Sequence, residues 1–224
     1  MKGLHNRGFN PSHVNPCIFY EENAIIITYV DDCIVLYRNK SVFDELIDSL
    51  KNGPEKIDLL TGEGVINVYL GIEIEMLSKT KPNMPKLFEM EQPFLVGCIL
   101  KLLSIVEGDN SKPTLATKPV LAKDSEGDIR NAEWNYRQAI GMLSYLTGST
   151  RPDISMAVNQ CAQFFNDPKL SHERAVKKIA RYLHGTKDCG IIFDPDPKRG
   201  LECFVDARIE TQYRFKLELG SKTE

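Results

Sequence analysis

The stretch from Ile25 to Tyr37, Ile-Ile-Ile-Thr-Tyr-Val-Asp-Asp-Cys-Ile-Val-Leu-Tyr, constrains the fold of this 224-residue chain more than any other feature. Its two apolar halves are rich in β-branched residues, which suit the pleated surface of a strand. Asp31 and Asp32 separate the halves, and Asp tolerates the backbone conformations of tight turns. The stretch therefore predicts a β-hairpin with two carboxylates at its tip.

Two adjacent carboxylates at a hairpin tip repel each other unless a positive group neutralises them. A hard divalent cation does this well, and Mg²⁺ prefers carboxylate oxygens together with substrate phosphates. The alternative is a solvated turn in which both charges face water. Asp31 and Asp32 are thus candidate metal ligands, and the rest of the chain has to decide between the two interpretations.

The composition is typical of a globular, intracellular protein, with 42% hydrophobic and 26% charged residues. No apolar run approaches the length of a membrane span, and residues 1–8 lack the apolar core of a signal peptide. The six cysteines are scattered without a CxxC pair, so we expect reduced thiols. Because the net charge is −3, any contact with nucleic acid requires a local basic patch or a metal. Neither the oligomeric state nor a choice between cytoplasm and nucleus follows from the sequence.

The first half of the chain predicts an antiparallel sheet with packed helices, which is an α+β arrangement. Cys17–Tyr20 adds a short strand before the hairpin. We expect Ser41 to cap a helix that Gly53 and Pro54 end. A strand over 65–75, a partner strand over 86–90 and a helix over 92–103 follow. The buried face of the first helix is expected to comprise Phe43, Leu46, Ile47 and Leu50.

The second half is expected to be helical, with helices over 134–146, 150–165 and 171–183. Thr150 is the predicted cap of the second of these. The polar surface of the third helix is basic, which fits either a solvated face or a contact with the phosphates of nucleic acid. Its candidate nucleic-acid-binding residues are Arg174, Lys177, Lys178 and Arg181.

Two short apolar runs, 190–193 and 201–206, predict a terminal β-hairpin, and Asp206 ends the second strand. A Pro, Asp, Lys and Arg-rich turn separates the runs. Beyond Ala207 the pattern is lost. We therefore expect residues 208–224 to be an unrelated or disordered tail.

Several motifs occur in one order over about residues 7–207, and in this order the chain resembles the reverse transcriptase of copia-type retrotransposons. The ordered set is far more specific than Tyr-Val-Asp-Asp alone. The matching pieces are Arg7-Gly8-Phe9, Pro16-Cys17-Ile18-Phe19, Tyr29-Val30-Asp31-Asp32, Tyr69-Leu70-Gly71-Ile72-Glu73-Ile74, Tyr136-Arg137-Gln138-Ala139-Ile140-Gly141, Tyr145-Leu146, Thr150-Arg151-Pro152-Asp153-Ile154, Ala157-Val158-Asn159 and Arg181-Tyr182-Leu183-His184-Gly185-Thr186.

The resemblance implies an RNA-directed DNA polymerase of the right-hand type. Asp31 and Asp32 would be palm carboxylates that hold Mg²⁺ or Mn²⁺ for two-metal DNA synthesis, and Tyr29 would lie beside the primer end. Asp206 would be a vestigial metal ligand of a ribonuclease H domain. The implied partners are an RNA or DNA template-primer and deoxynucleotides.

The same resemblance implies a domain order. Residues 1–106 would form a partial palm, 107–131 a linker, 132–188 the thumb and connection helices, and 189–207 the start of ribonuclease H. The expected fold is thus α+β: a partial polymerase palm, a helical thumb/connection region and a short terminal β-hairpin.

The chain departs from the family pattern at both ends. The family's third palm aspartate and its fingers lie upstream of the matching stretch, and the ribonuclease H pattern does not continue after Ala207. We therefore expect a truncated fragment with an incomplete metal site and without polymerase activity of its own. Two alternatives are a surviving nucleic-acid- or protein-binding module that uses the basic helix over 172–184, and a fragment completed by an aspartate from a partner chain.

Overall fold

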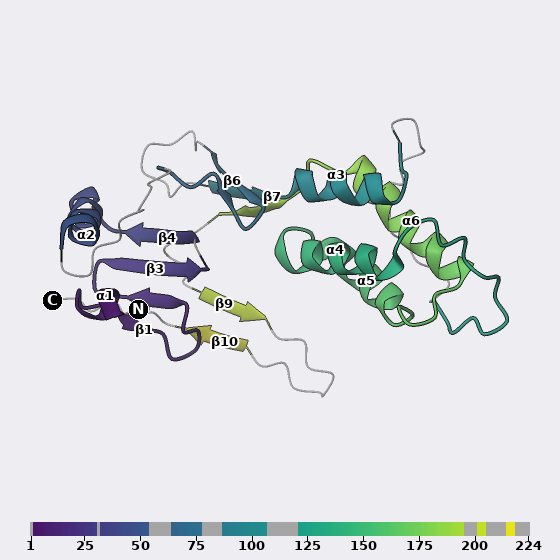
Figure 1. Cartoon of the computed structure of the whole chain (residues 1–224), viewed down its shortest axis with the longest axis horizontal. Coiled ribbons are helices and arrows are strands. Elements are labelled where there is room, and N and C mark those ends of the chain that lie inside the picture. The colour runs from purple at the N-terminus through teal and green to yellow at the C-terminus, as the bar shows by residue number, and fades with distance from the viewer. Residues whose placement is uncertain are drawn as a thin grey trace. The chain divides into compact units, whose positions relative to one another are not determined.

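A computed structural model describes residues 2–30, 32–53, 64–77, 87–106 and 121–194, and the backbone of 201–204 and 214–217 (Figure 1). The chain forms two compact units that divide between Ile66 and Asn67. Both units combine helices with antiparallel strands, which confirms the coarse α+β prediction. The polymerase domain boundaries stay a prediction. No helix in these ranges is long and apolar enough to cross a bilayer.

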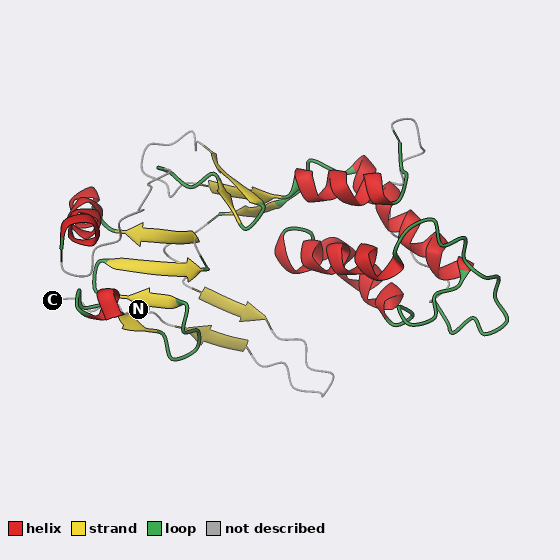
Figure 2. Cartoon of the chain, in the orientation of Figure 1, coloured by secondary structure: helices red, strands yellow, loops and turns green. Residues whose placement is uncertain are grey.

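The first unit contains a four-stranded antiparallel sheet in the order β1-β2-β3-β4 (Figure 2). Its strands match the predicted succession of a short strand followed by a hairpin. Each strand pairs with the next one along the chain, so short turns suffice to connect them. The strands are β1 (Asn10–Pro11), β2 (Ile18–Tyr20), β3 (Ala24–Tyr29) and β4 (Asp32–Tyr37).

A short helix, α1 (Lys2–His5), precedes this sheet, and the longer α2 (Lys40–Asn52) follows it. The predicted buried face of α2 is confirmed at Leu46 and Leu50, which join a core with Phe19 and Ile26 of the sheet. The predicted cap is wrong. The helix begins earlier than expected, so Ser41 lies inside its first turn. Asn39 occupies the cap position, and its side chain makes no capping hydrogen bond.

The second unit contains the antiparallel sheet β5-β6-β7-β8. The expected single strand over 65–75 is wrong, because the backbone turns back at Leu70 and Gly71. Both residues have positive φ angles, 52° and 74°, as a two-residue hairpin loop requires. The partner strand, expected at 86–90, is confirmed as β7. The strands are β5 (Val68–Tyr69), β6 (Ile72–Leu77), β7 (Leu87–Glu91) and β8 (Ile191–Phe193).

The predicted terminal hairpin of 190–193 with 201–206 is also wrong. Strand β8 pairs with β7, and β9 (Leu201–Phe204) pairs with β10 (Arg214–Leu217). Gly190 permits the first pairing, since a Cβ atom there would lie 2.3 Å from the carbonyl oxygen of Met90. Strand β10 lies in the segment expected to be a tail, and its alternating Arg-Phe-Lys-Leu sequence suits a strand.

The rest of the second unit is helical and holds the larger core. Helices α3 (Pro93–Leu102), α4 (Tyr136–Ser149), α5 (Ser155–Ala162) and α6 (Leu170–Gly185) surround it. The predicted helices over 92–103, 134–146 and 171–183 are confirmed within a few residues. Burial of their shared apolar faces drives this packing. Fully buried members include Ile99, Leu103, Leu143, Leu146, Ile154, Ile179 and Leu183.

Thr150 does not begin a helix, contrary to the sequence prediction. It is the C-cap of α4, and its buried hydroxyl donates a hydrogen bond of 3.0 Å to Oε1 of Gln92. The chain resumes as a 3₁₀ turn, η1 (Pro152–Ile154), before α5. The hydroxyl of Thr150, which the local sequence predicted to cap a helix, is thus bound to the buried side chain of Gln92.

Candidate functional site

The candidate catalytic hairpin has a two-residue tip. Tyr29 pairs with Asp32, so only positions 30 and 31 separate β3 from β4. Val30 has φ 52° and is 87% exposed, and a β-branched residue rarely adopts this left-handed conformation. The predicted hairpin is confirmed, with its tip one residue earlier than expected, since Asp32 begins β4. Asp31 lies outside the described residues.

The register places Tyr29 and Asp32 on one face of the sheet. Cross-strand partners share a face, and the alternate residues Ile26 and Val35 point the other way, into the core with α2. Tyr29 is 56% exposed, and Asp32 is also exposed. The aromatic ring and the carboxylate therefore lie side by side on the face opposite α2.

Cys33 follows Asp32 in sequence, and its thiol lies close enough for the charge of Asp32 to affect its pKa. Partial burial of the thiol and the negative charge of Asp32 both raise the pKa of Cys33. A thiolate beside a carboxylate is disfavoured because like charges repel. The sulfur is therefore poorly suited to be a nucleophile.

The hairpin has the right donor type for Mg²⁺, because an exposed carboxylate offers hard oxygen ligands. The number of donors is small. Across the parts of the chain that the structure describes, no group of three or more His, Cys, Asp or Glu side chains lies close enough to hold a metal ion. Asp32 thus belongs to no such group among the described residues, and its role as a metal ligand stays a prediction.

The predicted basic face lies on α6. Arg174, Lys178 and Arg181 recur at helical spacing and so share one side of the helix. Arg174 is exposed, and the other two are half-buried. The Nζ of Lys177 lies 3.4 Å from the buried carboxylate of Glu173 and 3.9 Å from the exposed carboxylate of Glu133. Asp206, the remaining candidate, lies outside the described residues.

Sequence reasoning missed a polar network at the start of η1. Arg151, whose side chain is 3% exposed, binds Asp153 and the carbonyl of Thr186. Tyr182 donates a hydrogen bond of 2.8 Å to the same Asp153 carboxylate. The motif Thr-Arg-Pro-Asp suited a helix cap equally well, so its composition alone did not reveal the network.

The network shifts two pKa values in opposite directions. Burial alone would raise the pKa of Asp153, but the hydrogen bonds from Arg151 and Tyr182 outweigh it and lower that pKa. The hydrogen bond to Asp153 is in turn the main cause that raises the pKa of Tyr182, since ionisation would remove the donated proton. The network therefore favours a charged Asp153 and a neutral Tyr182.

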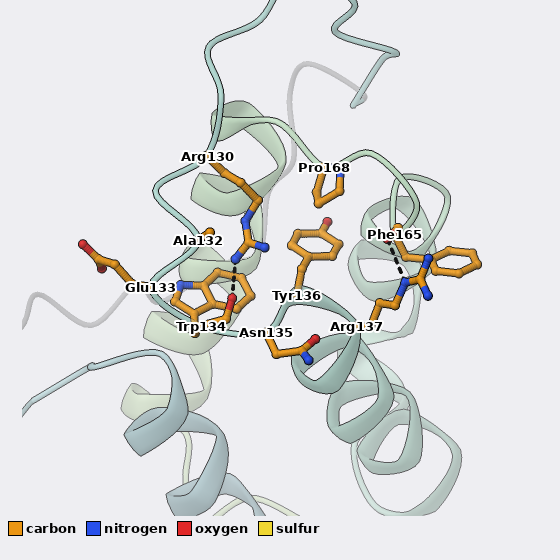
Figure 3. Close-up of a pocket in the computed structure, with 9 residues that line it drawn as sticks. All are labelled: Arg130, Ala132, Glu133, Trp134, Asn135, Tyr136, Arg137, Phe165 and Pro168. Carbon is orange, nitrogen blue, oxygen red and sulfur yellow. Dashed lines mark hydrogen bonds between the residues drawn. The ribbon is translucent and has the colours of Figure 1, made fainter.

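A second feature that sequence reasoning missed is a cavity of about 450 Å³ at the N-terminus of α4 (Figure 3). Arg130 and Trp134 form one side, and Arg137 and Phe165 form the other, with Tyr136 between them. These residues come from the loop before α4, its first turn and the segment after α5. The spacing of two arginines among aromatic residues was the available signal.

The comparisons with known proteins point to mobile elements. The chain is 28% identical over 182 residues to the retrovirus-related Pol polyprotein from transposon RE1 of Arabidopsis thaliana, covering 81% of this chain and 12% of that protein. It is 30% identical over 202 residues to the corresponding polyprotein from transposon TNT 1-94 of Nicotiana tabacum, covering 83% of this chain and 14% of that protein.

A third relative is an uncharacterized mitochondrial protein of Arabidopsis thaliana, 29% identical over 183 residues, which are 81% of this chain and 70% of that protein. No family model and no solved structure matches the chain. The chain spans only about an eighth of the transposon polyproteins, 12% and 14% of their lengths. Over most of its length the chain is therefore similar to a segment of the retrovirus-related Pol polyproteins of plant transposons.

Proposed function

We propose that the chain is the palm and thumb segment of a retrotransposon reverse transcriptase, with Asp31 and Asp32 as ligands of the catalytic metal. The register of the β3–β4 hairpin is the observation that carries this proposal. It pairs the exposed Asp32 with the exposed Tyr29 directly next to the two-residue tip.

In this proposal Tyr29 positions the primer terminus, and Asp32 with Asp31 holds the divalent cation. The chemistry that Mg²⁺ or Mn²⁺ supplies at such a site is charge neutralisation on the triphosphate and a lower pKa of the 3′-hydroxyl. Two carboxylates and one ring do not enclose a substrate. We therefore propose that the chain by itself binds the cation weakly and does not synthesise DNA.

Two measurements on the full chain test these statements separately. Water-proton relaxation with Mn²⁺ should detect binding that the double variant Asp31→Asn/Asp32→Asn loses and Asp44→Asn on α2 retains. Primer extension on a homopolymer template with Mg²⁺ or Mn²⁺ should show no incorporation. Incorporation that disappears in the double variant would disprove the inactivity and support the site, whereas unchanged Mn²⁺ binding in that variant would disprove the site.

A second candidate function is the binding of nucleic acid by α6. The observation that favours it is the alignment of Arg174, Lys178 and Arg181 along one side of the helix. Cations at this spacing can follow a phosphate backbone even in a chain with net negative charge. Lys177 is less suited to this role, because two carboxylates already neutralise it.

Fluorescence anisotropy of a labelled template-primer duplex over a range of salt concentrations tests this function. We expect salt-dependent binding that Arg174→Glu/Lys178→Glu abolishes and Lys187→Glu, just beyond the helix, leaves unchanged. Absence of binding at low salt would dismiss the nucleic-acid role. Retention of a protein instead of the duplex on the same surface would replace it with the protein-binding alternative.

A further inference from the structure

We propose that the cavity at the N-terminus of α4 binds one nucleotide of a single strand, with its phosphate between Arg130 and Arg137 and its base on Phe165. This inference rests on the proposal that the helical unit contacts nucleic acid. It adds a site that is separate from both the hairpin and the basic side of α6.

Aromatic rings hold both guanidinium groups at the cavity (Figure 3). The central carbon of Arg130 lies 4.9 Å from the ring centroid of Trp134 and 5.6 Å from that of Tyr136. That of Arg137 lies 5.3 Å from the ring centroid of Phe165. Stacking of this kind orients a guanidinium and restricts its rotamers before a ligand arrives.

Each guanidinium retains donors for a ligand. Arg130 uses Nε for Glu173 and Nη2 for the carbonyl of Trp134. Arg137 uses Nε for the carbonyl of Phe165, at 3.4 Å, and Nη2 for Asn166, at 3.0 Å. Within the described ranges, Nη1 of either arginine donates no hydrogen bond. Paired guanidinium donors suit the geometry of phosphate oxygens.

The electrostatics of the cavity also favour an anion. Arg130 is paired with the buried carboxylate of Glu173, at 3.3 Å, whereas Arg137 has no carboxylate partner among the described residues. The one acidic lining residue, Glu133, is mostly exposed and lies near Lys177, so Arg137 supplies the positive charge that an anion would meet.

The 14-residue helix α4 begins here with no acidic residue in its first turn, and the side chain of its N-cap, Asn135, accepts one hydrogen bond, from the N–H of Gln138. The positive end of the helix dipole therefore faces the cavity without a negatively charged side chain.

A buried donor lacks a partner at the same place. Trp134 is 6% exposed, and its indole Nε1 has no hydrogen-bond acceptor in the part of the chain that the structure describes. Buried N–H groups are almost always paired, so an acceptor atom of a ligand that reached this donor would satisfy it. Phosphate oxygens and base carbonyls both qualify.

The size and rim of the cavity select a nucleotide over a bare anion. Its volume of about 450 Å³ lies within the range of pockets that hold small organic ligands. Phe165 is 44% exposed at the rim, where a base can stack on it. Stacking on aromatic side chains tolerates every base, so we expect little sequence preference.

The chain carries a built-in probe, because Trp134 is its only tryptophan. Thymidine monophosphate, a short oligothymidylate and inorganic phosphate are titrated separately into the full chain at low salt, with Trp134 fluorescence as the readout. We expect both nucleotide ligands to change the fluorescence with saturation, the oligonucleotide at the lower concentration, and phosphate to bind at least tenfold more weakly than thymidine monophosphate, roughly the value of one stacked base.

Variants at the right-hand wall in Figure 3 test the assignment. Arg137→Gln should weaken thymidine monophosphate about tenfold, the value of one charge-assisted hydrogen bond. Phe165→Ala should weaken the nucleotide but not phosphate. Lys101→Gln, at an exposed position of α3, is the control for loss of a positive charge and should leave both affinities unchanged. Circular dichroism confirms folding of each variant.

Three outcomes would overturn the proposal: no fluorescence change at millimolar ligand, equal affinity for phosphate and nucleotide, or an Arg137→Gln variant that binds as well as the parent. Failure of the α6 function alone is recognisable. In that case duplex binding is absent at low salt, while thymidine monophosphate still changes the fluorescence of Trp134.

Discussion

The guanidinium of Arg151 donates two hydrogen bonds to the carboxylate of Asp153, from Nε to Oδ1 at 3.0 Å and from Nη2 to Oδ2 at 2.8 Å. The same guanidinium reaches the end of α6, where Thr186 accepts through its carbonyl at 2.7 Å and its hydroxyl at 2.8 Å. One buried side chain thus fastens the start of η1 to the C-terminus of α6. This contact links two segments of the helical unit that are 35 residues apart in sequence.

Replacing Arg151 with Lys should destabilise the helical unit by roughly 2–4 kcal/mol. A lysine keeps the charge but lacks the planar fork, so it loses at least two charge-assisted hydrogen bonds in a largely buried place. Urea unfolding followed by circular dichroism measures the loss. Arg174→Lys, at an exposed position of α6, should change the free energy of unfolding little, and equal effects of the two variants would contradict a specific role of the fork.

The pKa of Asp153, lowered by Arg151 and Tyr182, predicts a loss of stability in acid. A depressed carboxyl pKa contributes stability that is present above the unfolded value of about 3.9 and is lost as the pH falls through the folded value. The stability difference between the parent and Asp153→Asn should therefore shrink as the pH drops from 7 to about 3. Thermal melts over this range measure it, with the exposed Asp167→Asn as control; a constant difference would refute the linkage.

His172 should be essential to the start of α6. The ring is 1% exposed and stacks on Phe164 with centroids 4.1 Å apart. Its Nδ1 accepts from the backbone N–H of Lys169 at 3.0 Å, so its Nε2 carries the proton and donates to the carbonyl of Ala122 at 3.1 Å. His172→Ala should cost about 2–4 kcal/mol through the cavity and the unpaired groups. Unfolding by urea tests this against His13→Ala, an exposed site; losses of equal size would rule out the capping role.

Gly190→Ala should detach β8 from β7. The added Cβ would lie 2.3 Å from the Met90 carbonyl oxygen and 3.0 Å from Cβ of Glu91, so backbone must move. Amide hydrogen exchange should quicken in both strands. Gly97→Ala is the matched control, because nothing apart from the neighbouring backbone of α3 lies within 4 Å of its Cβ position, and it should stabilise by about 0.5–1 kcal/mol. Unchanged protection of β8 would contradict the close approach.

Asp32→Asn should make the Cys33 thiol more reactive. Burial remains, but the negative charge that also raises the pKa of Cys33 is removed. A larger thiolate fraction at a given pH speeds alkylation. Iodoacetamide labelling with peptide mass spectrometry measures the rate at Cys33, and Cys17, exposed before β2, serves as the internal control. Equal rates in the parent and the variant would show that the Asp32 charge does not reach the thiol.

Local sequence patterns predicted those elements whose structure depends mainly on residues within the same segment. The alternating, β-branched stretch around Tyr29 and Asp32 predicted the hairpin, and the 3.6-residue spacing of Leu46 and Leu50 predicted the buried face of α2. The errors fall where a distant partner decides. Thr150 was predicted to cap a helix, but its hydroxyl donates a hydrogen bond to the distant Gln92. Ile191 lies in a strand that pairs with β7, although β9 is the next strand along the chain.

The sequence by itself determined the α+β class, the hairpin that carries Asp32, and the kinship with retrotransposon Pol polyproteins. These depend on periodicity and on ordered motifs, both of which are properties of the linear chain. Only the tertiary structure decided that Arg151 joins Asp153 to Thr186, and that Arg130 and Arg137 line one cavity with Trp134. Such contacts form between segments brought together by burial of the core, and neither spacing nor composition specifies which polar side chains then meet.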